Sequence, residues 1–199
     1  MISVHINTHF AIGIIIASIF NFFFNFNILE FSMILIFSFI SDFDVFFSKY
    51  AKDRNHRMLI THSIIPGTII VIIGYLIDWP ALFISGYCYV LHVILDTLDW
   101  GTNLFYFQKK QIGLKLLISK EEFKNLSEYL NEYKNPASFF DQKYYNNKVC
   151  LLSDVVIFIL MITFVIIFAI QYALITLFYF IFLLFHLYRH FALKKTELH

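Results

Sequence analysis

The chain has 199 residues, of which 59% are hydrophobic and only 15% charged, and its formal net charge is +1. A soluble domain of this size could not bury so much apolar surface, since soluble proteins average about 25% charged residues. The composition therefore predicts an integral membrane protein, and the small net charge excludes a general attraction to nucleic acid.

Two membrane helices are predicted at the start of the chain. Over residues 1–41 the only charged side chain is Glu30, and this stretch is too long for a single span of about 20 residues. The polar residues around Asn27 indicate a turn. We therefore expect one helix over 8–25 and a second over 28–47.

A third and a fourth helix follow a polar segment over 48–57. The uncharged stretch 58–77 has the length of a membrane helix and is interrupted after Asp78. A further apolar run over 79–95 predicts the fourth helix, which ends in a polar patch over 96–103.

Residues 104–150 are the part of the chain with a soluble composition. Ser119 followed by Glu122 resembles a capping box. The apolar residues that recur at helical spacing after it are Phe123, Leu126, Leu130 and Tyr133. The pattern predicts an amphipathic helix that ends near Asn135–Pro136 and lies on the membrane surface or over the site, or else a solvated linker helix.

The last apolar run, Val155–Tyr188, carries no charge. As one helix it would measure about 51 Å, well beyond a hydrocarbon core of about 30 Å. We therefore predict a hairpin of two helices that turns near Gln171. The chain then divides into a membrane region over 1–103 with the candidate site, an insertion over 104–150, and a C-terminal hairpin with a basic tail over 151–199.

The basic residues are confined to three segments, which sets the orientation of the helices. They lie between helices two and three, between helices four and five, where there are eight lysines, and after helix six. With six helices, every Lys and Arg and both termini fall on the cytoplasmic side, as the positive-inside rule requires. The prediction is an all-α bundle of about six helices in the cell membrane, with a cytoplasmic amphipathic-helix insertion.

Most of the His and Asp residues fall at one end of this predicted bundle. They are His9 at the start of helix one, Asp42 and Asp44 at the end of helix two, His56 and His62 beside the start of helix three, and His92, Asp96 and Asp99 at the end of helix four. Ionisable side chains near membrane depth are costly, so they normally have partners and a function.

The spacing of these residues indicates a metal site. His92 and Asp96 are four residues apart, and Asp99 is three further on, so all three share one helical face. Asp42 and Asp44 would point to nearly opposite faces of a regular helix, so either the helix frays there or one of the two is not a ligand. Mixed His and carboxylate ligands are typical of zinc, manganese or ferrous iron.

The same residues, in this order, resemble the motifs of a known family. The motifs are Thr8-His9, Ser41-Asp42-Phe43-Asp44, His56-Arg57 with Thr61-His62-Ser63, and His92-Val93-Ile94-Leu95-Asp96 with Gly101 close behind. They resemble the YdjM-like family of membrane-bound metal-dependent hydrolases, which is similar to zinc-dependent phospholipase C and the fungal single-strand nucleases. The resemblance covers the chain up to about residue 103.

The resemblance implies a ligand set and supporting groups. The implied ligands of one or two divalent ions are His9, Asp42, His62, His92 and Asp96. Asp44 is implied as a further ligand or a supporting group, and His56 and Arg57 as groups that support the ligands or face a phosphate. The second His-x3-carboxylate pair of the phospholipases has no counterpart here, so a three-zinc site is not predicted.

The leading hypothesis is a hydrolase that acts on a phosphoester or lipid at the cytoplasmic membrane face. Zinc, or alternatively manganese or iron, would lower the pKa of a bound water. Asp44 or Asp99 would then act as general base, and Arg57 would stabilise charge on a phosphate.

Two other classes of function are open. One is a small proton or divalent-metal transporter or channel, and the other is a non-enzymatic scaffold whose segment 104–150 recruits a cytosolic partner. A transporter should carry polar groups near the membrane midplane. The predicted mid-helix stretches 12–20 and 157–170 are almost wholly apolar, which favours a site at the membrane surface.

Overall fold

The computed structural model describes residues 6–51, 55–107 and 110–198. Within these ranges the regular elements are α-helices and stretches of 3₁₀-helix, and no β-strand occurs. One isolated backbone bridge joins Thr102 to Ile112. The all-α class predicted from the sequence is confirmed.

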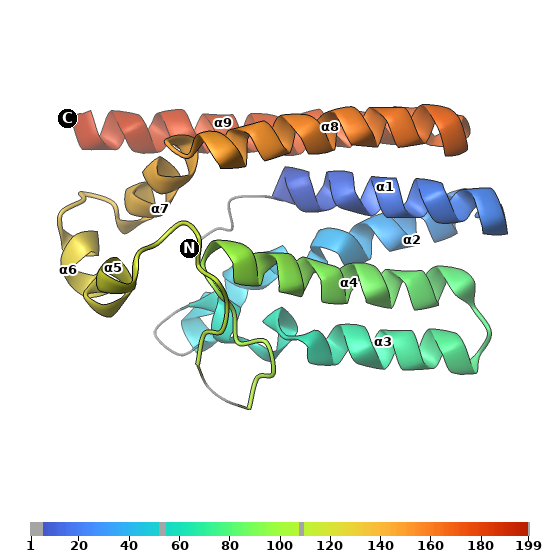
Figure 1. The fold of residues 1–199 in the computed structure, drawn as a ribbon, viewed down its shortest axis with the longest axis horizontal. Coiled ribbons are helices and arrows are strands. Elements are labelled where there is room, and N and C mark those ends of the chain that lie inside the picture. The colour runs from blue at the N-terminus through green and yellow to red at the C-terminus, as the bar shows by residue number, and fades with distance from the viewer. Residues whose placement is uncertain (1–5, 52–54, 108–109, 199) are drawn as a thin grey trace.

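The long helices lie nearly parallel along the longest axis of the molecule (Figure 1). They are α1 (Ile6–Phe24), α2 (Ile28–Phe39), α3 (Ile64–Leu76), α4 (Pro80–Asp99), α8 (Lys148–Phe168) and α9 (Leu177–Leu198). The shorter α-helices are α5 (Lys120–Lys124), α6 (Leu126–Asn131) and α7 (Pro136–Tyr145). The 3₁₀ segments are η1 (Ile40–Tyr50), η3 (His56–Met58), η4 (Ile60–His62) and η5 (Ile170–Thr176).

Within the described residues, four helical segments are long and apolar enough to cross a membrane, namely α1, α4, α8, and η5 together with α9. The helices α2 and α3 have 12 and 13 residues and do not reach this length. The structure therefore supports four membrane-length helices, and the six spans stay a prediction.

The third predicted helix was placed too early. It was expected over 58–77, but α3 begins at Ile64, where the Ser63 side chain accepts a hydrogen bond from the Ile65 N–H at 3.3 Å. The preceding residues form the turns η3 and η4. The apolar residues over 58–63 do not distinguish these turns from the start of a helix.

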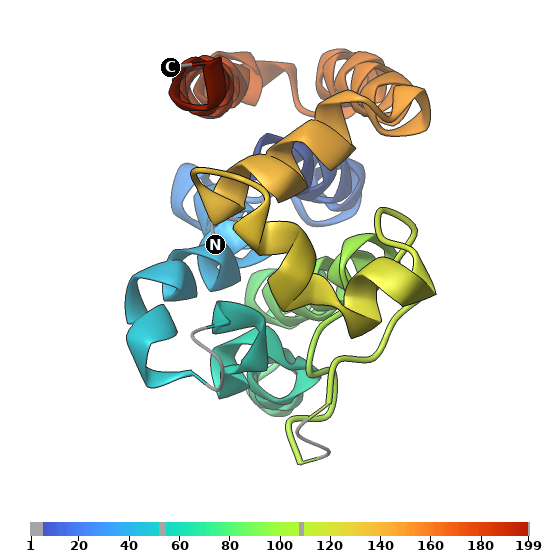
Figure 2. The ribbon, with the colours of Figure 1, turned by 90° about the vertical axis from the view of Figure 1, so that its left-hand side faces the viewer.

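The helices pack in layers, with α8 and α9 on α1 and α2, and then α4 and α3 (Figures 1 and 2). The main core combines buried side chains of α1, α2, α4 and α8. Along α8 the buried residues are Met161 and Val165, so most of its apolar surface faces outward. An outward apolar surface is the arrangement that contact with lipid requires.

Short turns join the helices at the end of the bundle away from the candidate site. Asn25 and Asp78 adopt positive φ angles of 48° and 52°, which turn the chain sharply after α1 and after α3. The indole of Trp79 donates to the Glu30 carboxylate at 3.0 Å and so links the two turns. The last apolar run divides at Ala169, close to the turn predicted near Gln171.

The insertion differs from the single amphipathic helix that was predicted. The capping box of Ser119 and Glu122 is present, but the helix breaks at Asn125 into α5 and α6. The apolar side chains of α6 pack with Trp100 and Phe139 in a second, smaller core. Pro136 begins α7 instead of ending a helix, because proline fits the first turn of a helix.

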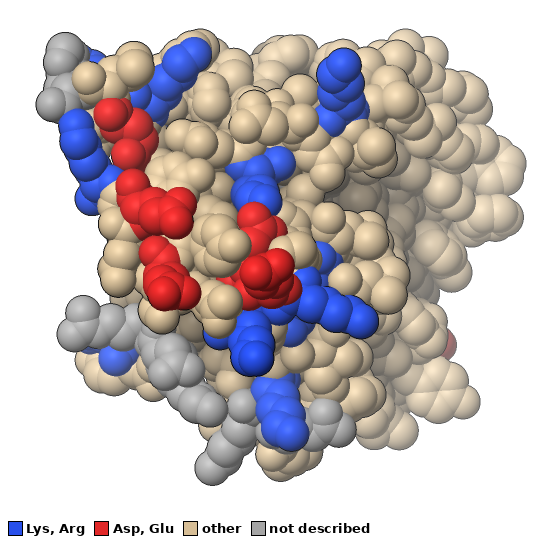
Figure 3. Space-filling view, turned by 60° about the vertical axis from the view of Figure 1, so that its left-hand side comes forward, with Lys and Arg blue, Asp and Glu red and all other residues tan. Residues whose placement is uncertain are grey.

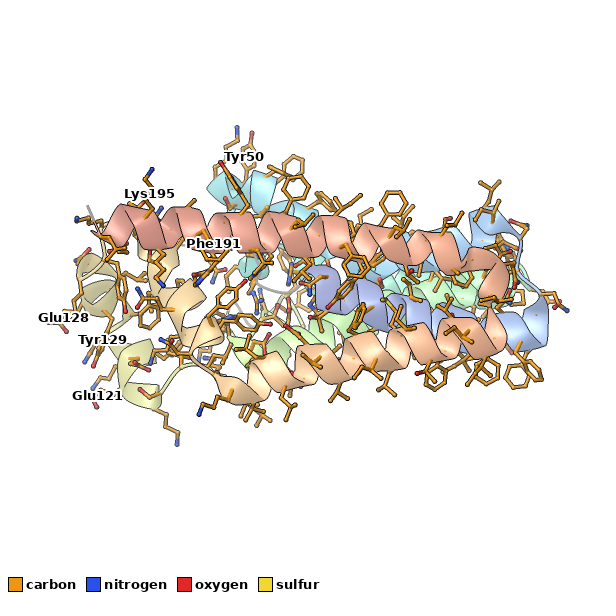
Figure 4. The ribbon with its side chains drawn as sticks, turned by 90° about the horizontal axis from the view of Figure 1, so that it is seen from above. Tyr50, Glu121, Glu128, Tyr129, Phe191 and Lys195 are labelled. Atoms are coloured by element: carbon orange, nitrogen blue, oxygen red, sulfur yellow. The ribbon has the colours of Figure 1, made fainter. Side chains whose placement is uncertain are left out.

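These helices lie across one end of the bundle. Figure 2 looks onto this end and shows α5, α6 and α7 crossing from α4 toward α8. Glu121, Glu128 and Lys195 lie at the same end, as labelled in Figure 4.

Helices α3 and α4 approach each other closely through glycines. A Cβ on Gly86 would lie 2.5 Å from the Val71 backbone nitrogen, and one on Gly74 would lie 2.4 Å from the Phe83 backbone nitrogen. We expect Gly86→Val to destabilise the protein by about 1–3 kcal/mol or more, because backbone atoms must move apart. Thermal unfolding in detergent, followed by tryptophan fluorescence, measures this loss.

The matched control is Tyr87→Val, at the next residue of α4. The Tyr87 side chain is 53% exposed, so its replacement should leave the melting temperature nearly unchanged. Equal melting temperatures for the two variants would contradict the close packing of α3 on α4.

Candidate metal centre

The predicted site residues lie at the end of the bundle where α1 begins and α4 ends. His9 comes from the first turn of α1, and His92 and Asp96 come from the last turns of α4. The segments η1, η3 and η4 supply the remaining side chains. The candidate residues from these elements are buried, apart from Asp99, which is half-buried.

The 3₁₀ segment η1 explains how two aspartates two residues apart face the same site. In an α-helix such residues lie about 160° apart around the axis, whereas three residues per turn reduce this to about 120°. Asp42 and Asp44 are both buried, while Phe43 between them is exposed. The first of the two predicted possibilities, a departure from regular α-helix, is therefore the one observed.

His92 is held with one nitrogen facing the carboxylates. Its Nδ1 lies 2.9 Å from the backbone oxygen of Ser38. A carbonyl oxygen can only accept, so Nδ1 carries the proton and Nε2 presents its lone pair. Nε2 lies 3.6 Å from Asp96 Oδ2 and 3.7 Å from Asp42 Oδ1, too far for hydrogen bonds.

The Ser38 oxygen lies in the last turn of α2, next to the start of η1. In a continued α-helix it would accept from the Asp42 N–H, but the α-helix stops at Phe39 and η1 follows. The same change of helix type thus places two aspartates and orients His92.

Asp96 is fixed by Arg57. The guanidinium donates to the Asp96 backbone oxygen at 3.1 Å and to its Oδ1 at 3.3 Å. Arg57 is fully buried, with 1% of its surface exposed. Its contact with Asp96 makes it a group that positions a carboxylate, and the predicted contact with a substrate phosphate stays a prediction.

His62 lies between two carboxylates. Its Nδ1 is 3.0 Å from Asp44 Oδ2 and its Nε2 is 2.5 Å from Asp96 Oδ2. The hydroxyl of Thr61 donates to the same Asp44 oxygen at 2.8 Å. The Thr102 hydroxyl donates to the His62 backbone oxygen at 2.8 Å, which holds η4 against the chain that follows α4.

The two histidines of η3 and η4 have opposite pKa shifts. Burial disfavours the charged form of His62, but hydrogen bonds to Asp44 and Asp96 outweigh it and raise the pKa to about 9. Burial, helped by the charges of His62 and Arg57, lowers the pKa of His56 to about 2. The His56 ring is therefore neutral at physiological pH.

These side chains form two groups that could hold a metal ion. The first group is Asp42, His62, His92 and Asp96, and the second is Asp44, His56 and His62. Within each group the ligand atoms lie within 4.8 Å of one another.

The first group fits a divalent ion. Two ligands of one tetrahedral zinc ion lie about 3.3 Å apart when each bond is about 2.0–2.1 Å. The distances of 3.6 and 3.7 Å from His92 Nε2 are close to this value, whereas His62 Nε2 and Asp96 Oδ2, now 2.5 Å apart, must separate for both to bind one ion. Both oxygens of Asp42 and the Nε2 of His92 are buried without a hydrogen-bond partner among the described residues, and a bound cation would satisfy these atoms.

The other predicted residues lie at different distances from this group. His9 is outside it, although its Nε2 is 3.3 Å from Asp96 Oδ1 and its ring lies against that of His92, with centroids 3.8 Å apart and planes tilted by 34°. Asp99 belongs to neither group. Four of the five predicted ligands thus come together, and the general-base role of Asp99 stays a prediction.

The histidines of α9 belong to a separate cluster. His186 contacts the Tyr145 hydroxyl at 2.5 Å, and His190 contacts the Asp141 carboxylate at 2.6 Å. These contacts hold α9 against α7. His186 and His190 are therefore interface residues, and neither belongs to the two metal groups found among the described residues.

Comparison of the chain with protein-family models, with curated proteins and with solved structures found no match.

Proposed function

We propose that this protein is a membrane-bound hydrolase that depends on a divalent metal, with zinc the best fit. The observation that carries the proposal is the buried group of Asp42, His62, His92 and Asp96, whose ligand atoms lie within 4.8 Å of one another. Two imidazoles and two carboxylates match catalytic zinc sites better than closed, Cys-rich structural ones.

The residues around the metal group have distinct roles in this proposal. When bound, the metal would supply Lewis acidity and lower the pKa of a water molecule. Arg57 holds Asp96 in place, and the Ser38 backbone oxygen keeps the His92 lone pair directed at the site. Asp44, with one oxygen shared between Thr61 and His62, orients the His62 ring.

A cavity near the site supports a lipid or lipid-linked substrate. It has a volume of about 330 Å³, its walls are mostly apolar, and it lies between α7, α8, α9 and the start of α1. Figure 4 shows α1 below the space between α8 and α9. The Thr8 hydroxyl, one residue before His9, donates to Asp154 in the cavity wall at 2.7 Å. A cavity of this size suits part of an acyl chain.

The charge distribution supports a cytoplasmic position for the site. In Figure 3 the charged side chains gather over the end of the molecule that carries α5, α6 and α7. Under the positive-inside rule this end faces the cytoplasm, with six helices crossing the membrane and both termini inside. The polar site at one end, instead of at the midplane, favours a hydrolase over the alternative transporter or channel.

Elemental analysis tests the proposal directly. The full chain, purified in detergent without added metal, should contain about one equivalent or more of a divalent transition metal. Removal of the metal with 1,10-phenanthroline should abolish hydrolysis of bis(4-nitrophenyl) phosphate or of phosphatidylglycerol vesicles, and added Zn²⁺ should restore it. The reason is that the oxygens of Asp42 and the Nε2 of His92 are buried without a hydrogen-bond partner among the described residues.

The control for this experiment is His190→Gln, which removes a histidine outside both groups. It should keep the wild-type metal content. A wild-type protein that holds no metal, even after loading with Zn²⁺, would rule out the proposed function.

A further inference from the structure

His56 is a buried histidine whose ring has no hydrogen-bond partner in the described part of the chain. Its exposed fraction is 0%, and both Nδ1 and Nε2 are buried without a partner. A buried imidazole normally bonds through at least one nitrogen, because an unpaired polar group away from water is costly. A metal ion would supply such a partner.

Two further side chains present ligand atoms at the same place. Asp44, His56 and His62 each offer one atom, and these atoms lie within 4.8 Å of one another. Asp44 Oδ1 is buried without a hydrogen-bond partner among the described residues, whereas Oδ2 contacts Thr61 and His62. One carboxylate and two imidazoles are a donor set suited to zinc or cobalt.

His62 belongs to both groups, and its two nitrogens face different carboxylates. Nδ1 faces Asp44 at 3.0 Å, and Nε2 faces Asp96 at 2.5 Å. The two nitrogens of an imidazole ring point away from each other, so they cannot bind the same ion. A ring that has lost both protons can bind one ion on each side.

We infer that the protein holds two divalent cations joined by the ring of His62. The first ion is the one that the proposed function requires, at Asp42, His92, Asp96 and His62 Nε2. The second ion binds Asp44, His56 and His62 Nδ1. The protons of the His62 ring pass to solvent as the ions bind.

The charges of the site are compatible with two ions in this buried volume. The described carboxylates of the two groups are Asp42, Asp44 and Asp96, and a bridging imidazolate adds one more negative charge. Arg57 is the basic residue that contacts them, through Asp96. Two divalent cations and Arg57 against these four negative charges leave a net charge of +1, and one cation and Arg57 against the three carboxylates alone leave zero, so charge permits either loading.

The bridge also sets the distance between the ions. Two metal–nitrogen bonds of about 2 Å across an imidazole ring place the ions about 6 Å apart. The ions of two-metal hydrolases are about 3.5–4 Å apart. The second ion therefore does not act on the same oxygen as the first. It positions His62 and holds η1 against η3 and η4.

Metal stoichiometry tests this arrangement. The full chain in detergent is stripped with EDTA, loaded with Zn²⁺, freed of excess metal and analysed by mass spectrometry of the elements. Wild type should bind two Zn²⁺ per chain, and His56→Gln should bind one, because His56 serves the second ion alone. The matched control, His190→Gln, should bind two.

The outcomes are distinguishable. A wild type that binds one ion, or a His56→Gln variant that still binds two, overturns the second site. A wild type that binds no ion overturns the proposed function itself.

Cobalt loading gives a second measurement that does not depend on a variant. Two Co²⁺ ions joined by an imidazolate couple their spins, so the electron paramagnetic resonance signal per cobalt should be lower at full loading than at half loading. An equal signal per cobalt at both loadings would show that the ions share no ring and would overturn the bridge.

Discussion

Asp96→Asn is expected to abolish metal binding at the first site and, with it, hydrolysis. Asp96 is fully buried and lies within reach of His9, His62 and His92, so its carboxylate is the central donor of the group. An amide has the same shape but no charge, and its NH₂ group would face the cation. The loss should exceed the 10- to 100-fold that removal of an outer partner costs. Zinc affinity by chelator competition and kcat/KM for the phosphodiester measure it.

Asp99→Asn is the matched control on the same helix. Asp99 lies outside both metal groups, so this variant should keep the metal content of the wild type. If Asp99 is the general base, its variant will lose activity while keeping metal, which separates that role from ligation. Unchanged zinc affinity in Asp96→Asn would contradict the ligand assignment.

Arg57→Met is expected to weaken both the fold and metal binding. The guanidinium bonds the backbone and the carboxylate of Asp96 from a position with 1% exposure. Its removal leaves a buried carboxylate without its cation, which costs about 3–5 kcal/mol. Metal affinity should fall about 10- to 100-fold because Asp96 is no longer fixed. Unfolding in detergent and chelator competition measure the two effects.

Arg57→Lys separates charge from geometry. Lysine keeps the positive charge but lacks the planar fork that reaches two oxygens of Asp96. Relative to Arg57→Met, this variant should therefore regain part of the stability but little of the metal affinity. Arg189→Met, on α9 and outside both groups, should leave metal affinity unchanged. Wild-type zinc affinity in Arg57→Met would contradict the positioning role of Arg57.

The sequence predicted the parts of the site that depend on helical spacing. His92 and Asp96 are four residues apart on a regular helix, so their shared face follows from periodicity alone. The long apolar stretches likewise predicted α1, α4 and the division of the last run. These features need no knowledge of tertiary contacts.

The parts that the sequence did not predict depend on backbone conformation. The change from α2 to η1 moves one hydrogen bond per residue from the fourth to the third preceding carbonyl, and no residue type in this stretch marks it. The Ser38 oxygen that orients His92 belongs to the main chain, so side-chain patterns do not show it. The hydroxyl of Thr102 is a comparable case, since a lone threonine after α4 carries no signal of its contact with η4.

The division of the insertion into three short helices was also missed. From the sequence, Asn135–Pro136 predicts the end of a helix, but in the structure Asn135 caps α7 and Pro136 begins it. Pro in the first turn and Pro after the last turn look alike in a sequence, and the apolar residues that decide between them lie in a core shared with Trp100.

The ligands of the metal centre are far apart along the chain, from Asp42 to Asp96, and this has a consequence for assembly. No short peptide contains the centre, so it cannot form until η1, η4 and α4 have come together, and its contacts close late in folding. A metal that binds only the assembled centre stabilises the folded state in proportion to the logarithm of its free concentration. The resistance of this protein to unfolding should therefore follow the zinc supply of the cell in which it is made.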